Sequence, residues 1–367
     1  MNRLDELIQR LCPDGVEYEA LENICEIKRG IRVVKSQLNQ SGKYPVYQNS
    51  LTPLGFFEQT NAPANTTFII VAGAAGEIGY SICDFWAADD CFYFLPTSIL
   101  SSRYLYHFLL MKQPYLFSKV RKASIPRLAR SAIEKLKIPF PPLEVQREIV
   151  RLLDQFTELT AELTAELTAR KKQYAYYRDV LFRTAEDAKV CYLSDISENC
   201  DNQRKPVTSA NRIAGEYPYY GASGIVDYVD GYIFDGDFLL ISEDGANLLA
   251  RSAPIAFSIS GKNWVNNHAH VLRFDIYETR RYVEIYLNSI DLSPYITGGA
   301  QPKLNQQNLN KIPIPLPAPD EQRRIVSILD RFDALCNDLT SGLPAEIEAR
   351  RKQYEYYRDK LLTFKEL

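Results

Sequence analysis

Basic and amide side chains gather in three short stretches of the first part of the chain. Residues 28–35 and 119–130 are rich in Lys and Arg, and residues 47–50 are polar. Lys and Arg neutralise phosphates, while Arg, Gln and Asn give paired hydrogen bonds to base edges. These stretches are suited to contacts with nucleic acid, although solvated loop charge is the favoured interpretation for any one residue. The candidates are Lys28, Arg29, Arg32, Lys35, Gln48, Asn49, Lys119, Arg121, Lys122, Arg127 and Arg130.

The second part of the chain repeats these stretches with fewer charges. Residues 215–220 (GEYPYY) match 42–47 (GKYPVY), and residues 300–304 (AQPKL) match 124–128 (SIPRL). The only two tryptophans also fall at corresponding places, each just after a strand-like apolar segment. A diverged globular domain is therefore present twice. The second copy adds the candidates Arg204, Lys205, Arg212, Ser223, Gln301, Lys303 and Asn305.

Few residues suggest catalysis or metal binding. His268 and His270 would share one face of a strand, where a metal pair is one interpretation and a hydrogen-bonded pair the favoured one. The run Gly73, Gly76, Gly79 is followed by a strand-like segment, so it predicts a hairpin turn rather than a phosphate-binding loop. The methyltransferase tetrapeptide Asp/Asn-Pro-Pro-Tyr/Phe, a P-loop and a Gly-x-Ser-x-Gly motif are missing from the sequence. We therefore expect no catalytic residue, no metal and no cofactor in this chain.

A long helix must follow the first polar part. Apolar residues recur every three or four positions from Glu144 to Phe182. This period predicts one helix of roughly 55–60 Å, the length of a coiled coil rather than of an ordinary globular helix.

The helix is repeated at the end of the chain. Residues 163–181 and 343–361 are identical at 13 of 19 positions. The second apolar stripe includes Ile325, Leu335 and Leu339. It carries four extra residues, about one helical turn, which should preserve the apolar face. The run 341–344 (SGLP) should kink or break this helix.

Each stripe needs a partner, and the other stripe is the nearest one. Parallel and antiparallel pairings are both conceivable; the antiparallel one makes the direct repeat a pseudo-two-fold object that could meet duplex DNA in the same way twice.

The repeated helical motif has surface beyond its apolar seam. Its tyrosines cannot all face one partner helix, because neighbouring helical positions point about 100° apart. Docking of the same external protein at both copies and internal packing alone are equally favoured. The candidate partner-binding residues are Arg170, Tyr174, Tyr177, Arg178, Arg350, Tyr354, Tyr357 and Arg358.

Composition indicates an ordinary globular protein with local rather than global basic character. The 367 residues are 46% apolar and carry a net charge of −3. The N-terminus has no apolar signal region and no apolar run is long enough for a bilayer span, so we expect a cytoplasmic protein without membrane contact. The seven cysteines form no Cys-x-x-Cys pair, which fits reduced thiols.

The pattern as a whole predicts an α+β fold. Strand-like runs at 67–72, 80–85 and 238–242 and helices near 103–111 and 280–288 make the two globular parts strand-rich. We expect two diverged, strand-rich domains joined by two long antiparallel coiled-coil helices. The expected division is 1–142 for the first domain, 143–189 for the first long helix, 190–318 for the second domain and 319–367 for the second long helix.

Two diverged halves, each ending in a Pro-rich run, a Gln-Arg-x-Ile-Val helix start and an Arg-Lys-Gln-Tyr-x-Tyr-Tyr-Arg-Asp helix, resemble the DNA specificity subunit of type I restriction-modification systems. The family's words are recognisable at 76–79, 264–270 and 298–305. In the first half, residues 87–90 and 122–126 depart from the last two words.

The resemblance implies a non-catalytic, sequence-specific DNA-binding subunit of a host-defence restriction system. The two globular domains would be target recognition domains and the two long helices conserved spacers. The target would be a bipartite, asymmetric sequence in double-stranded DNA. The spacer helices would recruit two modification (methyltransferase) subunits, which bind S-adenosylmethionine, and through them the restriction subunits. The alternative is a non-catalytic scaffold of an unrelated complex whose domains bind proteins.

Overall fold

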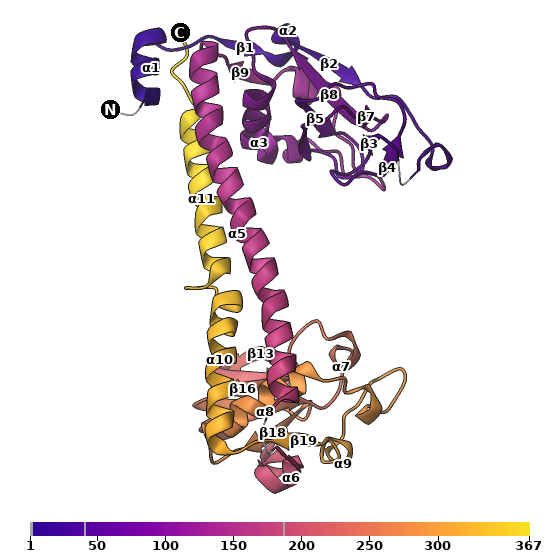
Figure 1. Ribbon diagram of the computed structural model, residues 1–367, viewed down its shortest axis with the longest axis vertical. Helices are drawn as coiled ribbons and strands as arrows, with labels where there is room; N and C mark the ends of the chain where they lie inside the picture. The colour runs from indigo at the N-terminus through magenta and orange to yellow at the C-terminus, as the bar shows by residue number, and fades with distance from the viewer. Residues whose placement is uncertain (1–2, 40–41, 186–187) are drawn as a thin grey trace. The chain divides into compact units, whose positions relative to one another are not determined.

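The computed structural model describes residues 3–39, 42–185 and 188–367 (Figure 1). The chain divides into two units, one made of residues 1–165 and 345–367 and the other of residues 166–344. Each unit contains a strand-rich domain, part of the helix α5 (Leu143–Arg183) and a C-terminal helix.

The first domain is built on small sheets. Its strands are β1 (Tyr18–Ala20), β2 (Cys25–Arg29), β3 (Tyr44–Tyr47), β4 (Gly55–Phe57), β5 (Thr66–Ile70), β6 (Ile78–Ser81), β7 (Trp86–Ala87), β8 (Cys91–Pro96) and β9 (Lys137–Pro139). An antiparallel sheet has the order β2-β8-β5-β6, a mixed sheet has the order β4-β3-β7, and β1 pairs with β9. The short helices are α1 (Arg3–Leu11), α2 (Leu21–Ile24), η1 (Lys35–Gln37) and α4 (Arg130–Glu134).

The core of this domain lies between the β5-centred sheet and α3 (Ser102–Ser118). Every residue of β5 is buried, as expected for a continuous apolar strand. Leu105, Phe108 and Leu109 of α3 are fully buried in the same region, together with Ile149 of α5. The helix expected near 103–111 is therefore confirmed and continues for seven more residues.

The second domain repeats this construction. Its strands are β10 (Lys189–Cys191), β11 (Glu198–Asn199), β12 (Ala214–Gly221), β13 (Gly224–Val229), β14 (Phe234–Asp235), β15 (Phe238–Ser242), β16 (Ala256–Ile259), β17 (Lys262–Val265), β18 (Ala269–Arg273) and β19 (Ile314–Leu316). Its helices are α6 (Leu193–Ile196), η2 (Asp201–Gln203), η3 (Ser209–Asn211), α7 (Asn247–Ala250), α8 (Tyr277–Ser289), η4 (Ser293–Tyr295) and α9 (Gln306–Leu309).

Strand pairing confirms that the two domains are copies. The sheet β11-β18-β15-β16 corresponds to β2-β8-β5-β6, and β13-β12-β17 corresponds to β4-β3-β7. Trp86 lies beside Val46 in a parallel pair, and Trp264 lies beside Tyr219 in the equivalent pair. The glycine-rich turn after β5 joins it to the antiparallel strand β6, so the predicted hairpin is also confirmed.

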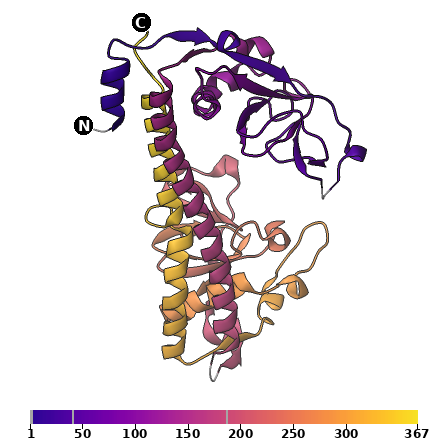
Figure 2. The same ribbon diagram turned by 45° about the horizontal axis from the view of Figure 1, so that its top comes forward.

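In each unit, α5 runs antiparallel to its partner helix. In the first unit, Tyr18 pairs with Pro139 just before α5 begins, and its hydroxyl donates to the carbonyl of Phe364 just after α11 (Leu343–Leu361) ends. In the second unit, Phe182 near the end of α5 packs on Tyr282, whose hydroxyl donates to Pro315 shortly before α10 (Pro319–Asn337) begins. Figures 1 and 2 show α5 beside these helices in both views.

The second spacer helix is broken between α10 and α11, as the sequence predicts. The Asp338 carboxylate accepts hydrogen bonds from the backbone N–H and hydroxyl of Thr340 and from the hydroxyl of Ser341. These bonds hold the pKa of Asp338 well below its usual range. The prediction that the four extra residues preserve the apolar face is wrong here: Leu339 lies in the break and is 80% exposed, and Leu335 is exposed as well.

Within the described ranges, none of the helices combines the length and the apolar character that crossing a bilayer requires.

Candidate nucleic-acid interface and spacer contacts

In the first domain, the turn after β5 brings two of the predicted stretches together. The backbone N–H of Gly73 donates to Pro126 at 3.2 Å, and that of Ala74 donates to Asn49 at 3.0 Å. Gly73 has a φ of +81°, and a Cβ there would lie 2.9 Å from the Asn49 carbonyl oxygen. Glycine is required at this joint because a side chain would push the polar loop at 47–50 away from the basic stretch at 119–130.

The connection from β7 to β8 brings in the third stretch. The indole Nε1 of Trp86 donates to the Ile31 carbonyl at 2.8 Å, and the guanidinium Nε of Arg29 donates to the Asp89 carbonyl at 3.0 Å. The N–H of Ala88 then donates to Tyr47, next to the polar loop. The stretch at 28–35 and the polar loop at 47–50 therefore meet around residues 86–89, and the polar loop meets the basic stretch at 119–130 around Gly73.

The second domain uses the same hydrogen bonds at corresponding positions. Gly245 N–H donates to Pro302 at 3.1 Å, and Asn266 N–H donates to Tyr220 at 3.1 Å. The indole of Trp264 donates to the Lys205 carbonyl at 2.6 Å. The correspondence of 300–304 to 124–128 that the sequence predicts is thus confirmed by backbone geometry.

The side chains predicted to contact DNA in the first domain differ in their freedom. Lys28 pairs with Glu26 at 3.4 Å, and Gln48 is half-buried. Arg130 pairs with Glu134 at 2.6 Å and donates to the Ile27 carbonyl. The others lie on exposed positions: Arg29, Arg32, Lys35, Asn49, Lys119, Arg121, Lys122 and Arg127. Their contacts to DNA stay predictions.

In the second domain, some predicted side chains are engaged within the fold. The guanidinium of Arg212 lies over the Tyr219 ring at 4.4 Å and pairs with Asp227. Asn305 caps α9 by accepting from the N–H of Asn308. The exposed candidates are Lys205, Ser223, Gln301 and Lys303.

Arg204 belongs to a buried network of charges. It contacts Glu243 at 2.7 Å and Asp201 at 3.3 Å, and Lys303 reaches Glu243 at 3.2 Å. The Nε2 of His270 donates to the Leu304 carbonyl at 2.8 Å, and its Nδ1 lies 2.6 Å from Asp201.

The carboxylates of this network have metal-ligand spacing, since ligand atoms of Asp201, Glu243 and His270 lie within 4.8 Å of one another. Arg204 and Lys303 already supply positive charge there. Burial raises the pKa of Asp201, but His270, the backbone N–H of Val271 and the charge of Arg204 together outweigh it, so the pKa is lowered. Burial likewise raises the pKa of Glu243, but Arg204, His270 and Lys303 together outweigh it, so this pKa is also lowered. The geometry is that of an internal ionic support beneath residues 303–304.

His268 and His270 are hydrogen-bonded separately. His268 Nδ1 lies 2.9 Å from the carboxylate of Asp244, and His268 is half exposed in the turn before β18. The favoured interpretation of a hydrogen-bonded pair is confirmed, with each histidine bonded to a different acidic side chain.

A buried glutamine fastens each globular domain to its spacer helix. Gln146 accepts from the N–H of Ser101 and donates to the carbonyls of Ile99 and Pro141. Gln322 accepts from the Thr279 hydroxyl at 2.7 Å and donates to Pro317.

An ion pair adds a second fastening in each unit. Arg103 of α3 contacts Asp154 of α5 at 2.8 Å, and Arg281 of α8 contacts Asp330 of α10 at 2.7 Å. In the first unit, His107 also bridges Asp154 and the hydroxyl of Tyr354.

Comparison with known proteins also finds two copies of one domain. The model for the type I restriction modification DNA specificity domain matches residues 13–170 and again residues 185–349. The chain belongs to this family. A protein of Haemophilus influenzae assigned as a type I restriction enzyme specificity subunit is 33% identical over 377 residues, covering 95% of this chain and 96% of that protein.

Other members of the specificity family are similar as well. The EcoR124I/EcoR124II specificity subunit of Escherichia coli is 36% identical over 263 residues, covering 63% of each chain. The solved type I S subunit of M. genitalium has the same fold, with a TM-score of 0.67 at 18% identity, covering 95% of this chain and 97% of that one.

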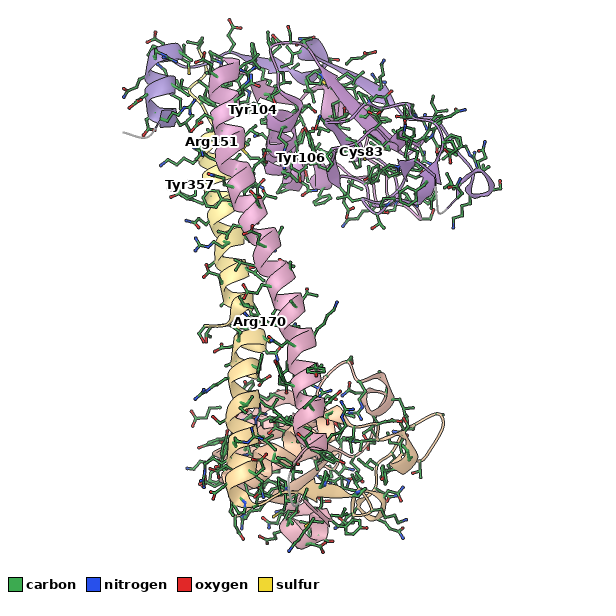
Figure 3. All side chains as sticks on the ribbon, viewed as in Figure 1. Cys83, Tyr104, Tyr106, Arg151, Arg170 and Tyr357 are labelled. Atoms are coloured by element: carbon green, nitrogen blue, oxygen red, sulfur yellow. The ribbon has the colours of Figure 1, made fainter. Side chains whose placement is uncertain are left out.

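The tyrosines of the repeated spacer motif form three equivalent pairs: Tyr174 and Tyr354, Tyr177 and Tyr357, and Tyr176 and Tyr356. Tyr174 packs near Phe332, and Tyr354 is bonded to His107; burial raises the pKa of both. Tyr177 lies 5.9 Å from the Phe332 ring. Tyr357, labelled on α11 in Figure 3, stacks on Phe156 at 5.4 Å. These four are the predicted partner-binding tyrosines, and that role stays a prediction.

The most exposed tyrosines of the repeated motif were not among the candidates. Tyr176 is 63% exposed and Tyr356 is 62% exposed. The sequence offered one signal for them, because the three tyrosines of a motif cannot all point at one helix.

The predicted partner-binding arginines lie on the same helices and contact nearby residues, and Arg358 also donates to the Leu110 carbonyl of α3 at 3.4 Å. Arg170, labelled on α5 in Figure 3, reaches Glu166 and Gln173, and Arg350 reaches Glu346 and Gln353. Arg178 and Arg358 pair with the neighbouring Asp179 and Asp359.

The buried Gln146 and Gln322 and the half-buried Asp154 and Asp330 were also missed as functional residues. They belong to the repeated block 146–154 and 322–330, so the repeat was their signal.

Proposed function

We propose that this chain is the DNA-reading subunit of a type I restriction-modification complex, and that each globular domain reads one part of a bipartite target in double-stranded DNA. The observation that carries the proposal is the shared backbone framework: the same hydrogen bonds in both domains present different side chains. Arg127 of the first domain, for example, is replaced by Lys303 in the second. Two copies that differ in their exposed side chains are suited to an asymmetric sequence.

The spacer helices set the gap between the two parts of the target. α5 is continuous over 41 residues, from the end of the first domain to the start of the second. Adding one helical turn to a spacer should therefore widen the tolerated gap and leave both parts of the target unchanged.

In this proposal the partner subunits, and not this chain, catalyse the reactions. Two methyltransferase subunits that bind S-adenosylmethionine would dock on the repeated spacer motif, and restriction subunits would join through them. The target adenine must leave the base stack to be methylated. Because the net charge of this chain is −3, we expect the free subunit to bind DNA weakly and the assembled complex to bind it well at matched salt.

The first test is to express this chain with the methyltransferase subunit encoded beside it in a host without adenine methylation. Single-molecule sequencing then maps methylated adenines over the genome. The expected result is one split, asymmetric motif. A stable complex that methylates no motif would favour the protein-binding scaffold instead.

A second test concerns the exposed tyrosines. The double variant Tyr176→Ala with Tyr356→Ala should weaken capture of the methyltransferase subunit at least about tenfold, because aromatic anchors dominate protein interfaces. Tyr115→Ala is the matched control, since Tyr115 is a half-exposed tyrosine on α3. Retention of full affinity by the double variant, with circular dichroism unchanged, would remove these tyrosines from the docking surface.

A further inference from the structure

The loop at 121–127 in the first domain presents an apolar side chain among cations. Ile125 is 55% exposed. Arg121, Lys122 and Arg127 on the same loop are exposed as well. Single exposed apolar residues are common on protein surfaces, so the exposure of Ile125 decides nothing without the geometry of its loop.

Hydrogen bonds close this loop and fasten it to the sheet. The N–H of Arg121 donates to Arg127 at 2.8 Å, and the N–H of Arg127 donates back at 3.2 Å. The residues on either side of Arg127 are also held, because Pro126 accepts from Gly73 and Leu128 donates to Val71. Ile125 therefore stands on a short, closed loop beside the polar residues at 47–50.

We propose that Ile125 is an apolar wedge that enters between base pairs of the part of the target read by the first domain. This deepens the proposed function and rests on it. Proteins that partly unstack DNA insert an aliphatic side chain between base steps and hold the flanking phosphates with Lys and Arg. The three exposed cations around Ile125 complement the negative charge of the phosphates, which favours duplex DNA over a protein partner.

The second domain carries a different residue on the same loop. The N–H of Thr297 donates to Lys303 at 2.8 Å and the N–H of Lys303 donates back at 2.7 Å, so this loop is closed in the same way. Gln301 precedes Pro302 there as Ile125 precedes Pro126. Gln is suited to hydrogen bonding with a base edge, so the wedge belongs to the first domain alone.

The experiment uses the complex of the full chain with its methyltransferase subunit. The DNA is a duplex that contains the split motif identified by sequencing. The fluorescent adenine analogue 2-aminopurine replaces one adenine of either strand at a time in both parts of the target. A wedge unstacks its neighbours, so fluorescence should rise at one step of one part, besides the signal of the flipped adenine. Ile125→Ala should abolish that rise and weaken binding roughly tenfold, because the apolar contact is lost. Its salt dependence should not change, since no charge is removed.

Two controls separate the possible outcomes. Ile82→Ala removes a more exposed isoleucine of the same domain and should change nothing. Lys122→Gln should weaken binding and reduce the salt slope by about one, while the fluorescent step remains. Wild-type fluorescence and affinity in Ile125→Ala would overturn the wedge and leave the proposed function intact. A wild-type complex that binds no split motif would overturn both.

Discussion

The sheet beneath the loop is apolar in the first domain and charged in the second. In the first domain Phe92 pairs with Ile69, and in the second domain the equivalent residue, His270, pairs with Ile241. Val71 of the first domain corresponds to Glu243 of the second. The residue that follows Arg127 or Lys303 makes the same hydrogen bond in both domains. The N–H of Leu128 donates to the Val71 carbonyl, and the N–H of Leu304 donates to the Glu243 carbonyl. The backbone framework thus tolerates either kind of support.

The two kinds of support respond to different perturbations. Packing around Phe92 depends on buried area, whereas the network around His270 depends on every charge keeping its partner. A difference of degree occurs at the spacer. Arg103 contacts the single carboxylate of Asp154 and lies over the rings of Tyr80 and Tyr106. The equivalent Arg281 contacts the carboxylates of Glu284, Asp330 and Asp333.

The largest difference between the domains should follow from removing Arg204. Arg204→Met leaves Glu243 and Asp201 without their guanidinium partner, and breaking such a buried pair costs about 3–5 kcal/mol. Hydrogen exchange of peptides that cover β15 and β18 should accelerate accordingly, with β5 and β8 unaffected. The neighbouring exposed cation gives the control, Lys205→Met, which should leave exchange unchanged. Equal protection in both variants would show that the network does not support the second domain.

A smaller difference in stability between the two units should follow from replacing the buried glutamine of each unit. Gln146→Leu strands three backbone groups, whereas Gln322→Leu strands one backbone carbonyl and the Thr279 hydroxyl. Because each unsatisfied buried group costs about 1–3 kcal/mol, the first variant should be the more destabilised. Denaturant unfolding and exchange of α3 and α8 measure the order. Gln155→Leu, at an exposed position of α5, is the neutral control, and the opposite order would mean that water replaces the lost bonds of Gln146.

The smallest difference between the two units should be in how their stability changes when the pH is lowered. Burial lowers the pKa of His107, which faces Asp154, Arg103, Arg358 and Tyr354. The unfolded chain therefore binds the proton more readily, and the stability of the first unit should fall as pH drops below about 6.5. The equivalent position in the second unit is Ile285, which does not titrate.

The measurement is exchange in α3 and α8 at pH 7.5 and 5.5, after correction for the intrinsic exchange rate. His107→Ile should remove the loss in α3. If α3 and α8 lose protection equally in the wild-type chain, His107 is not the cause.

The sequence by itself determined the parts that depend on period and repetition. The apolar period predicted α5, the glycines after β5 predicted a hairpin turn, and the run 341–344 predicted the break in the second spacer. The duplication predicted two equivalent domains. These features are local or repeated, so no long-range information was needed.

Only the tertiary structure decided what each candidate side chain contacts. Arg204 and Lys205 are adjacent cations in the sequence, yet one is held by two buried carboxylates and the other is exposed. Tyr176 and Tyr177 are equally adjacent, and only Tyr177 lies against a phenylalanine of another helix. The partners of these side chains come from segments tens to hundreds of residues away, and packing, which sets burial and pairing, exists only in the folded chain.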